Sequence, residues 1–141
     1  MKDQVDTMKK KNLAVDCLGS FLSFDERREV QIRLKKGETK IIYVAPEQLN
    51  NETTVGLLVQ PNRPVSLLAI DEAHCMSEWG HSFRPEYLRL AQFAKTCNAE
   101  RVVCLTATAT PAVSKDMCKK FDIKDENCVQ TSFHRNNLNL A

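Results

Sequence analysis

The sequence has few of the features that mark a metal-binding, secreted or membrane protein. Its six cysteines include no C-x-x-C pair, and no apolar run approaches the length of a signal peptide or a membrane span. A cysteine inside an apolar run, such as Cys104 in RVVCL, is typical of a buried small hydrophobic residue. We therefore expect no zinc in this segment, no membrane contact and a reducing, intracellular compartment.

Two further absences restrict the possible functions. Twenty basic and eighteen acidic side chains give a formal net charge of +2, which is too balanced for composition alone to indicate a polyanionic partner. None of the four glycines precedes a Lys-Ser or Lys-Thr pair, so the phosphate-binding loop G-x-x-x-x-G-K-[ST] is missing. Any nucleotide or nucleic-acid function has to be argued from other motifs.

The alternation of short apolar runs with longer amphipathic segments predicts one α/β domain. The chain has 141 residues and is 43% hydrophobic, which is enough for a single core. Several runs are continuously apolar, as expected of a parallel sheet with helices on both faces. The predicted strands are 13–18, 40–45, 65–70, 101–106 and 128–133. Ser23 with Glu26, and Thr110 with Pro111, predict helix starts between the strands, and 50–64 is expected to hold a short helix in a loop-rich connection.

Two adjacent carboxylates follow the third apolar run. VSLLAI (65–70) delivers Asp71 and Glu72 to the carboxyl end of a predicted strand, where ligands collect in parallel sheets. Such a pair fits nucleotide hydrolysis, in which one carboxylate holds Mg²⁺ directly or through water and its neighbour orients the attacking water. A strand that simply ends in solvated charge remains an alternative for these two residues taken alone.

A histidine and three threonines are predicted to meet at the same edge. His74 follows Glu72 closely, and LTATATP (105–111) places Thr106, Thr108 and Thr110 after the next predicted strand. Their hydroxyls could bond His74 or the carboxylates, which would link the site to a second element. The alternative is that these threonines only favour strands and cap a helix.

An aromatic segment leaves directly from the acidic site. Trp79, Phe83 and Arg84 stand among serines and a glycine, a composition typical of a loop. Aromatic rings stack on unpaired bases, and arginine adds phosphate or cation–π contact. The alternative for each ring is burial in an ordinary core. A base-stacking loop at this position would let nucleic acid and nucleotide sense each other.

The stretch DEAHCMSEWGHSFRPEY (71–87) resembles motif II and the aromatic-rich loop of RecQ-family DNA helicases. The resemblance extends along the whole chain. MKDQV (1–5) is similar to the end of motif Ia, YVAPEQL (43–49) to motif Ib with Gln48 where Arg is common, and LTATATP to motif III. SFHRNNL (132–138) is similar to the close of the first RecA-like lobe, with Asn136 where the family often has Pro.

The resemblance implies a partial RecA-like helicase lobe, residues 1–141, that lacks the P-loop strand from the middle of its sheet. It implies roles for individual side chains as well. Asp71 would bind magnesium and Glu72 would activate the hydrolytic water, whereas His74 would act at the catalytic site and couple it to DNA. The implied DNA-sensing loop is Trp79, Phe83 and Arg84, the implied coupling segment is Thr106 to Thr108, and the implied single-strand track includes Pro46 and Glu47.

Members of this family are ATP-driven 3′→5′ DNA helicases that act in recombination and repair. The resemblance therefore implies ATP and Mg²⁺ as cofactors of the full-length protein, and DNA single strands and duplex junctions as substrates. It also implies the P-loop segment and a second RecA-like lobe as partners, and a nuclear or nucleoid location. We expect this chain alone to be inactive, and we expect unpaired apolar surface where the strand is missing. A non-catalytic DNA-binding remnant is the alternative function, and a purely structural domain is a third.

Overall fold

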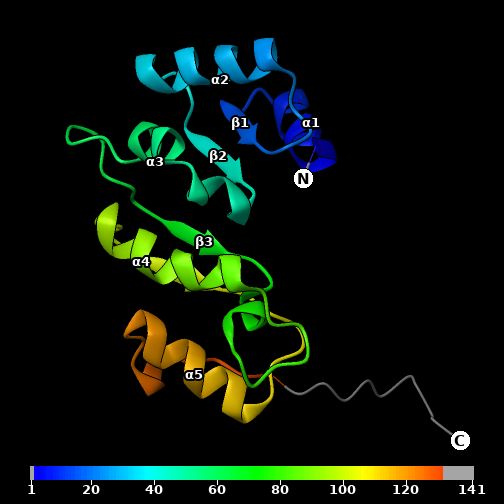
Figure 1. Cartoon of the computed structure of the whole chain (residues 1–141), viewed down its shortest axis with the longest axis vertical. Helices are drawn as coiled ribbons and strands as arrows, with labels where there is room; N and C mark the ends of the chain where they lie inside the picture. Colours follow the sequence, from blue (N-terminus) through cyan, green and yellow to red (C-terminus); the bar gives the residue numbers. More distant parts are fainter. Residues whose placement is uncertain (1, 132–141) are drawn as a thin grey trace, which may run out of the picture.

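Four short parallel strands form two separate two-stranded sheets in the computed structural model, which describes residues 2–131 (Figure 1). Strand β1 (Val15–Leu18) pairs with β2 (Ile41–Val44), and β3 (Leu68–Ile70) pairs with β4 (Val102–Cys104). The α-helices are α1 (Lys2–Lys10), α2 (Phe24–Lys36), α3 (Glu52–Leu58), α4 (Leu88–Thr96) and α5 (Pro111–Phe121). Short 3-10 turns are η1 (Pro46–Asn50), η2 (Ala73–Met76), η3 (Pro85–Tyr87) and η4 (Asp125–Asn127). None of these helices is long and apolar enough to cross a bilayer.

The predicted α/β class with parallel strands is confirmed, but one predicted strand is wrong within the described part. The first four apolar runs each contain a strand. Residues 128–131 of the fifth run have no regular structure, and 132 and 133 lie outside the described residues. A strand requires a neighbour that completes its hydrogen-bond ladder. Within residues 2–131 β4 pairs with β3 on one edge, and no strand pairs with its other edge.

Helices cover both faces of the β1–β2 sheet. Side chains alternate across a strand, so Val15 and Cys17 share one face of β1, where they pack in a cluster with Val5 of α1. On the opposite face, the carboxylate of Asp16 accepts hydrogen bonds from Arg33 of α2. All four residues of β1 are buried as a result.

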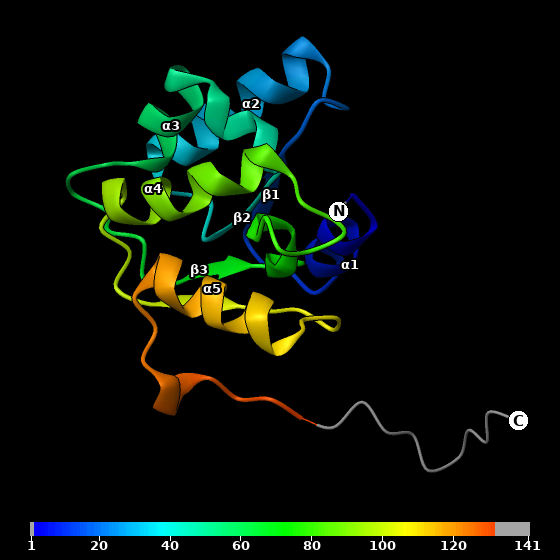
Figure 2. The ribbon, with the colours of Figure 1, turned by 60° about the horizontal axis from the view of Figure 1, so that its bottom comes forward.

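The β3–β4 sheet is covered on one face only. Ile70 and the partly buried Cys104 contribute to the main hydrophobic cluster with Phe93 of α4 and Met117 of α5. Figure 2 shows β3 beside these two helices. The intervening residue of β4 points the other way, and Val103 is 37% exposed, followed by Leu105 at 52%. Within residues 2–131 no helix covers this face, so its apolar side chains are open to solvent.

Helix α2 begins and ends at strong local signals. The Ser23 side chain accepts a hydrogen bond from the Glu26 N–H at 3.3 Å, and a Glu26 carboxylate oxygen accepts from the Ser23 N–H at 2.8 Å. The helix ends at Gly37, whose φ of 74° is left-handed and whose N–H donates to carbonyls of the last turn. These signals lie within a few residues of each other, which is why the sequence alone predicted this helix start.

We expect Ser23→Ala to lower the free energy of unfolding by about 1 kcal/mol, because the first turn of α2 loses an acceptor for an orphan N–H. Urea unfolding followed by circular dichroism measures the change. Ser20→Ala, in the exposed turn before the helix, is the control and should leave the midpoint unchanged. An equal loss in both variants would contradict the capping argument.

Candidate functional site

The ends of β3 and β4 meet in one hydrogen-bonded corner. The Leu105 N–H donates to the Ile70 carbonyl at 2.8 Å, and the Ala73 N–H donates to the Leu105 carbonyl at 2.9 Å. The parallel ladder therefore continues past both strands. It places the turn with Asp71 and Glu72 directly beside the residues that follow β4, LTATATP (105–111), which we call the threonine segment.

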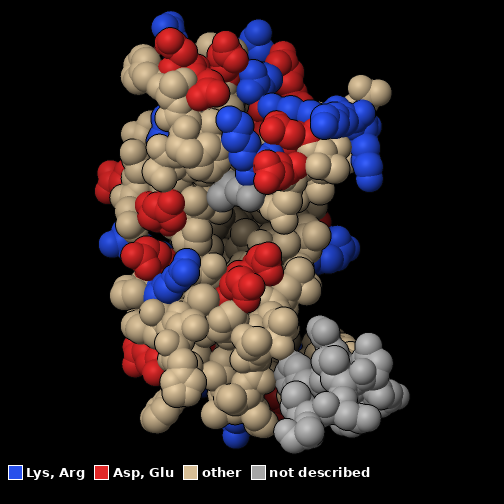
Figure 3. Space-filling view, turned by 90° about the vertical axis from the view of Figure 1, so that its right-hand side faces the viewer, with Lys and Arg blue, Asp and Glu red and all other residues tan. Residues whose placement is uncertain are grey.

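The acidic turn has an uncommon backbone. Glu72 has φ 49° and ψ 38°, which is the left-handed region, and its N–H donates to Asp71 Oδ1 at 2.9 Å. A non-glycine residue held there costs about 1 kcal/mol or more and is frequent at functional sites. Both carboxylates are exposed. Figure 3 views the side toward which the β3 arrow points in Figure 1, and it shows a hollow in this face with acidic side chains at its margin.

His74 contacts both the acidic turn and the threonine segment. Its Nδ1 lies 2.8 Å from Thr106 Oγ1 and 3.2 Å from Glu72 Oε2. In the tautomer with a proton on Nδ1, this nitrogen donates to both oxygens. Thr106 Oγ1 also accepts from the Thr108 N–H at 3.2 Å, so four residues from two strand ends form one chain of polar contacts. His74 is largely buried, whereas Thr108 is exposed.

The residues at this corner fit a magnesium ion as a partial set of ligands. One oxygen of the Asp71 carboxylate accepts the Glu72 N–H, which leaves its second oxygen open to solvent. Mg²⁺ is commonly held by one or two carboxylates, with water and phosphate oxygens completing the octahedron. Within residues 2–131 no group of three or more His, Cys, Asp or Glu side chains is arranged to hold a metal. Asp71 is thus the residue that would hold the ion, with ligands from water and nucleotide.

The aromatic segment is a tight loop with an exposed tip. The Gly80 N–H donates to the Ser77 carbonyl at 3.1 Å, and the Arg84 N–H donates to the Cys75 carbonyl at 2.7 Å. Trp79 is 80% exposed at the tip. Phe83 is half-buried and Arg84 is exposed. The loop begins at the end of η2 (Met76), so Trp79 follows His74 by five residues in the sequence.

Pro46 and Glu47 lie on a neighbouring turn. They begin η1 immediately after β2, with Pro46 at the first helical position and Glu47 exposed. Turn η1 packs against η3, the turn that follows the aromatic loop. The structure therefore brings the predicted strand track next to the end of the predicted DNA-sensing loop.

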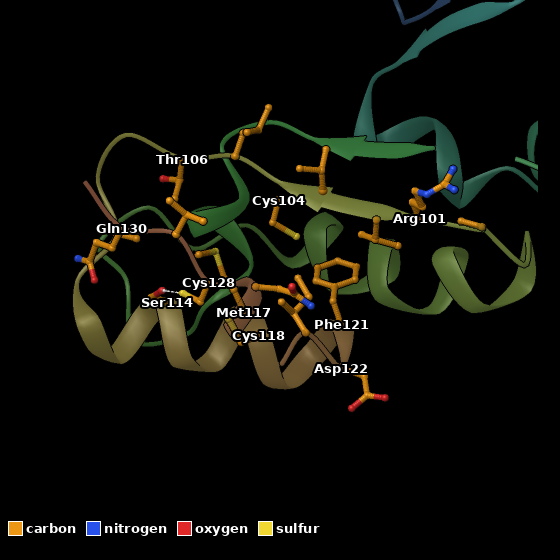
Figure 4. A pocket seen from close by; sticks show the side chains of 18 of the residues that line it. Arg101, Cys104, Thr106, Ser114, Met117, Cys118, Phe121, Asp122, Cys128 and Gln130 are labelled. Carbon is orange, nitrogen blue, oxygen red and sulfur yellow. Dashed lines mark hydrogen bonds between the residues drawn. The ribbon is translucent and has the colours of Figure 1, made fainter. Parts of the chain in front are cut away.

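A cavity of about 710 Å³ lies between β4, α5 and the segment 127–131 (Figure 4). Figure 4 shows Cys104 on the β4 side facing Met117 and Phe121 on the α5 side. Thr106 lines the cavity, but neither Asp71 nor Glu72 does. The cavity runs along the free edge of β4, which is where the sheet lacks a strand within the described residues.

The sequence did not indicate the two residues of α5, Lys120 and Asp116, that hold the base of the aromatic loop. Lys120 Nζ on α5 donates to the Met76 carbonyl at 2.9 Å and to Asp116 Oδ2 at 3.0 Å. Burial raises the pKa of Asp116, but the hydrogen bond from Ser77 and the pairing with Lys120 outweigh it, so this pKa lies below its ordinary value. The four-residue spacing of Asp116 and Lys120 is visible in the sequence, but their partners on the loop are not.

Comparison with known proteins shows the family to which the chain belongs. Residues 1–117 match the family described as DEAD/DEAH box helicase. The chain belongs to this family. The resemblance of the sequence to RecQ helicases is likewise confirmed by its relatives. The chain is 41% identical over 139 residues to the ATP-dependent DNA helicase RecQ of Bacillus subtilis. It is 40% identical over 129 residues to the mouse ATP-dependent DNA helicase Q5, and 35% identical over 144 residues to the ATP-dependent helicase wrn-1 of Caenorhabditis elegans.

These matches cover most of this DEAD/DEAH box chain but little of the relatives. They include 98%, 88% and 100% of the chain, against 23%, 13% and 13% of the three relatives. The chain therefore corresponds to less than a quarter of each of these helicases. The acidic corner at 71–74, the threonine segment and the first part of α5 all lie inside the matched range 1–117.

Proposed function

We propose that this chain is part of an ATP-dependent 3′→5′ DNA helicase of the RecQ type. In this proposal ATP is hydrolysed at the Asp71–Glu72 corner, and hydrolysis is coupled to the grip of Trp79, Phe83 and Arg84 on single-stranded DNA. The complete enzyme acts on single strands and duplex junctions during DNA repair and recombination, in a nucleus or nucleoid. The phosphate-binding loop and the second RecA-like lobe belong to other parts of that enzyme.

The observation that carries the proposal is the double contact of His74. The same ring nitrogen of His74 is close to Glu72 and to Thr106, and the exposed Trp79 lies five residues after His74 in the sequence. A shift of Glu72 on nucleotide binding or hydrolysis therefore changes the hydrogen bonding of His74. That change reaches the threonine segment and the start of the loop without a long path through the core.

Each residue of the corner has a distinct part in the proposed chemistry. Asp71 would hold a magnesium ion through its open carboxylate oxygen, and the charge of the ion would stabilise the phosphate oxygens in the transition state. Glu72 accepts a proton from, or orients, the attacking water, since its exposed carboxylate is held on one side only. Pro46 and Glu47 lie beside the path of the single strand, next to the end of the loop.

The chain alone is expected to release no phosphate from ATP with Mg²⁺ and single-stranded DNA, because its sequence contains no phosphate-binding loop. In a longer chain that carries such a loop upstream, DNA-stimulated phosphate release should appear, and Glu72→Gln should lower it about 100-fold. Glu78→Gln, a neighbouring exposed carboxylate, is the control and should retain activity. Robust turnover by the 141-residue chain that Glu72→Gln abolishes would contradict the expected inactivity.

A non-catalytic DNA-binding segment is the second candidate, and the exposure of Trp79 in a chain without a phosphate-binding loop favours it. The genomic sequence upstream of Met1 separates the two candidates. An in-frame G-K-[ST] loop supports the helicase. Single-strand binding that is independent of ATP in the native gene product supports the alternative.

A further inference from the structure

Helix α5 joins the threonine segment to the base of the aromatic loop. It begins at Thr110, the last threonine of the segment, whose side chain accepts from the Val113 N–H at 3.4 Å. Along the same helix, Val113 lies against the loop, because a methyl group added at Gly80 would be 3.7 Å from Val113 Cγ2. One helix therefore carries contacts to both parts of the site.

Two turns further along α5 the contacts become polar and largely buried. Lys120 Nζ donates to the Met76 carbonyl, and its ion-pair partner Asp116 lies beside Ser77. Met76 and Ser77 have no exposed surface. The side chains of Lys120 and Asp116 are 25% and 20% exposed, so the pair is partly buried between α5 and the base of the loop. A hydrogen bond from a charged donor to a carbonyl is stronger than one between two neutral groups.

The alternative is that this pair merely stabilises α5 as an ordinary four-residue ion pair. Such pairs contribute little when exposed and do not need a third partner. Here the ammonium bonds the carbonyl of the residue that precedes the loop, 44 positions away in the sequence. Loss of that bond would leave the buried Met76 carbonyl, just before the loop, without this donor. The resulting loss of stability should therefore be concentrated in the loop.

We propose that Lys120 and Asp116 are positioning residues that fix the aromatic loop to α5. Helix α5 thereby forms a second link between the threonine segment and the aromatic loop, separate from the link through His74. The inference rests on the proposed function for its DNA part only. Movement of the threonine segment displaces the start of α5, and the Lys120 and Asp116 contacts transmit that displacement to the residues just before Trp79.

The test uses the whole 141-residue chain, in which Trp79 is the single tryptophan and so reports the loop alone. We expect Lys120→Met to make the hydrogen-bonded loop amides of Gly80 and Arg84 exchange about tenfold faster, with unchanged exchange in α2. The fluorescence anisotropy of Trp79 should fall. Lys120→Arg, which keeps charge and donors, should restore both values, and Asp116→Ala should act in the same direction as Lys120→Met.

The matched control is Lys119→Met, which removes the same charge from an exposed neighbour on α5. A labelled single-stranded oligothymidylate should bind the Lys120→Met chain about fivefold more weakly than the Lys119→Met chain, because only the first variant loosens the aromatic loop. The attraction to phosphate is reduced equally in both variants. Unchanged loop exchange and anisotropy in Lys120→Met would overturn the inference. If those readouts change but the wild-type chain binds no DNA, the positioning role stands and the proposed function of the loop fails.

Discussion

Trp79→Ala should weaken the binding of single-stranded DNA to this chain about tenfold, the largest loss expected from any change in the aromatic loop. The indole is 80% exposed and therefore contributes little to the core, but it offers a large flat surface for an unpaired base. Stacking of one base on an aromatic ring contributes roughly 1–3 kcal/mol, which corresponds to about 5- to 150-fold in affinity. Fluorescence polarisation of a labelled oligothymidylate measures the dissociation constant.

The chain offers a closely matched control in Phe24. This ring is 81% exposed at the start of α2, but it lies outside the loop and the acidic corner. Phe24→Ala should leave the affinity unchanged. Arg84→Met should instead reduce the slope of affinity against salt concentration by about one, since it removes one phosphate contact. Equal affinities for Trp79→Ala and wild type would favour a purely structural domain.

Arg33→Met should lower the free energy of unfolding by about 3 kcal/mol, the largest stability effect expected in the chain. Arg33 makes two hydrogen bonds to the Asp16 carboxylate, from Nε at 3.1 Å and from Nη2 at 2.7 Å. Asp16 is 3% exposed on β1. Removal of the guanidinium leaves a buried carboxylate with Thr39 and the half-exposed Lys9, whose Nζ is 3.7 Å from Asp16 Oδ1, as its partners. The value lies at the low end of the range for broken buried pairs because the Arg33 side chain is 35% exposed.

Urea unfolding of Arg33→Met against Arg28→Met, an exposed arginine on the same helix, measures this effect. Burial raises the pKa of Asp16, but its bonds to Arg33 and Thr39 outweigh this, so the pKa lies below 3.8. A carboxyl whose pKa is lowered by folding stabilises the protein above its unfolded pKa, and that contribution is lost as the pH falls through the folded value. The difference between the two variants should therefore be constant near neutral pH and should narrow in the acid range, as the Asp16 carboxyl becomes protonated. A difference under about 0.5 kcal/mol at neutral pH would contradict the role assigned to the pair.

Much of the local structure was predictable because its signals are short. Ser23 with Glu26 and Thr110 with Pro111 each mark a helix start within four residues, and the structure contains both caps. The run VSLLAI predicted a strand that ends at the acidic turn, and β3 ends at Ile70. Parallel strands place their carboxyl ends at a common edge, so contact between the threonines and His74 or the carboxylates was predictable. Only the structure showed that the contact is between His74 and Thr106.

Other features depended on partners that the sequence does not identify. The run that begins at Cys128 was predicted to be a strand, but residues 128–131 form none, and within the described residues no strand lies against the outer edge of β4. Val103 and Leu105 are exposed because no helix of residues 2–131 covers that face of the β3–β4 sheet, although helices were expected on both faces. Roles for the individual site residues remain predictions, which the variants above are designed to test.

The sequence by itself determined the order of helices and strands, the helix caps and the family to which the chain belongs, since these depend on residues that are close together along the chain. Only the tertiary structure decided which face of each sheet is covered, how far the ring of Trp79 projects into solvent, and that Lys120 bonds the Met76 carbonyl. Burial and long-range hydrogen bonds are properties of pairs of surfaces. They become defined only when segments distant in the sequence pack against each other.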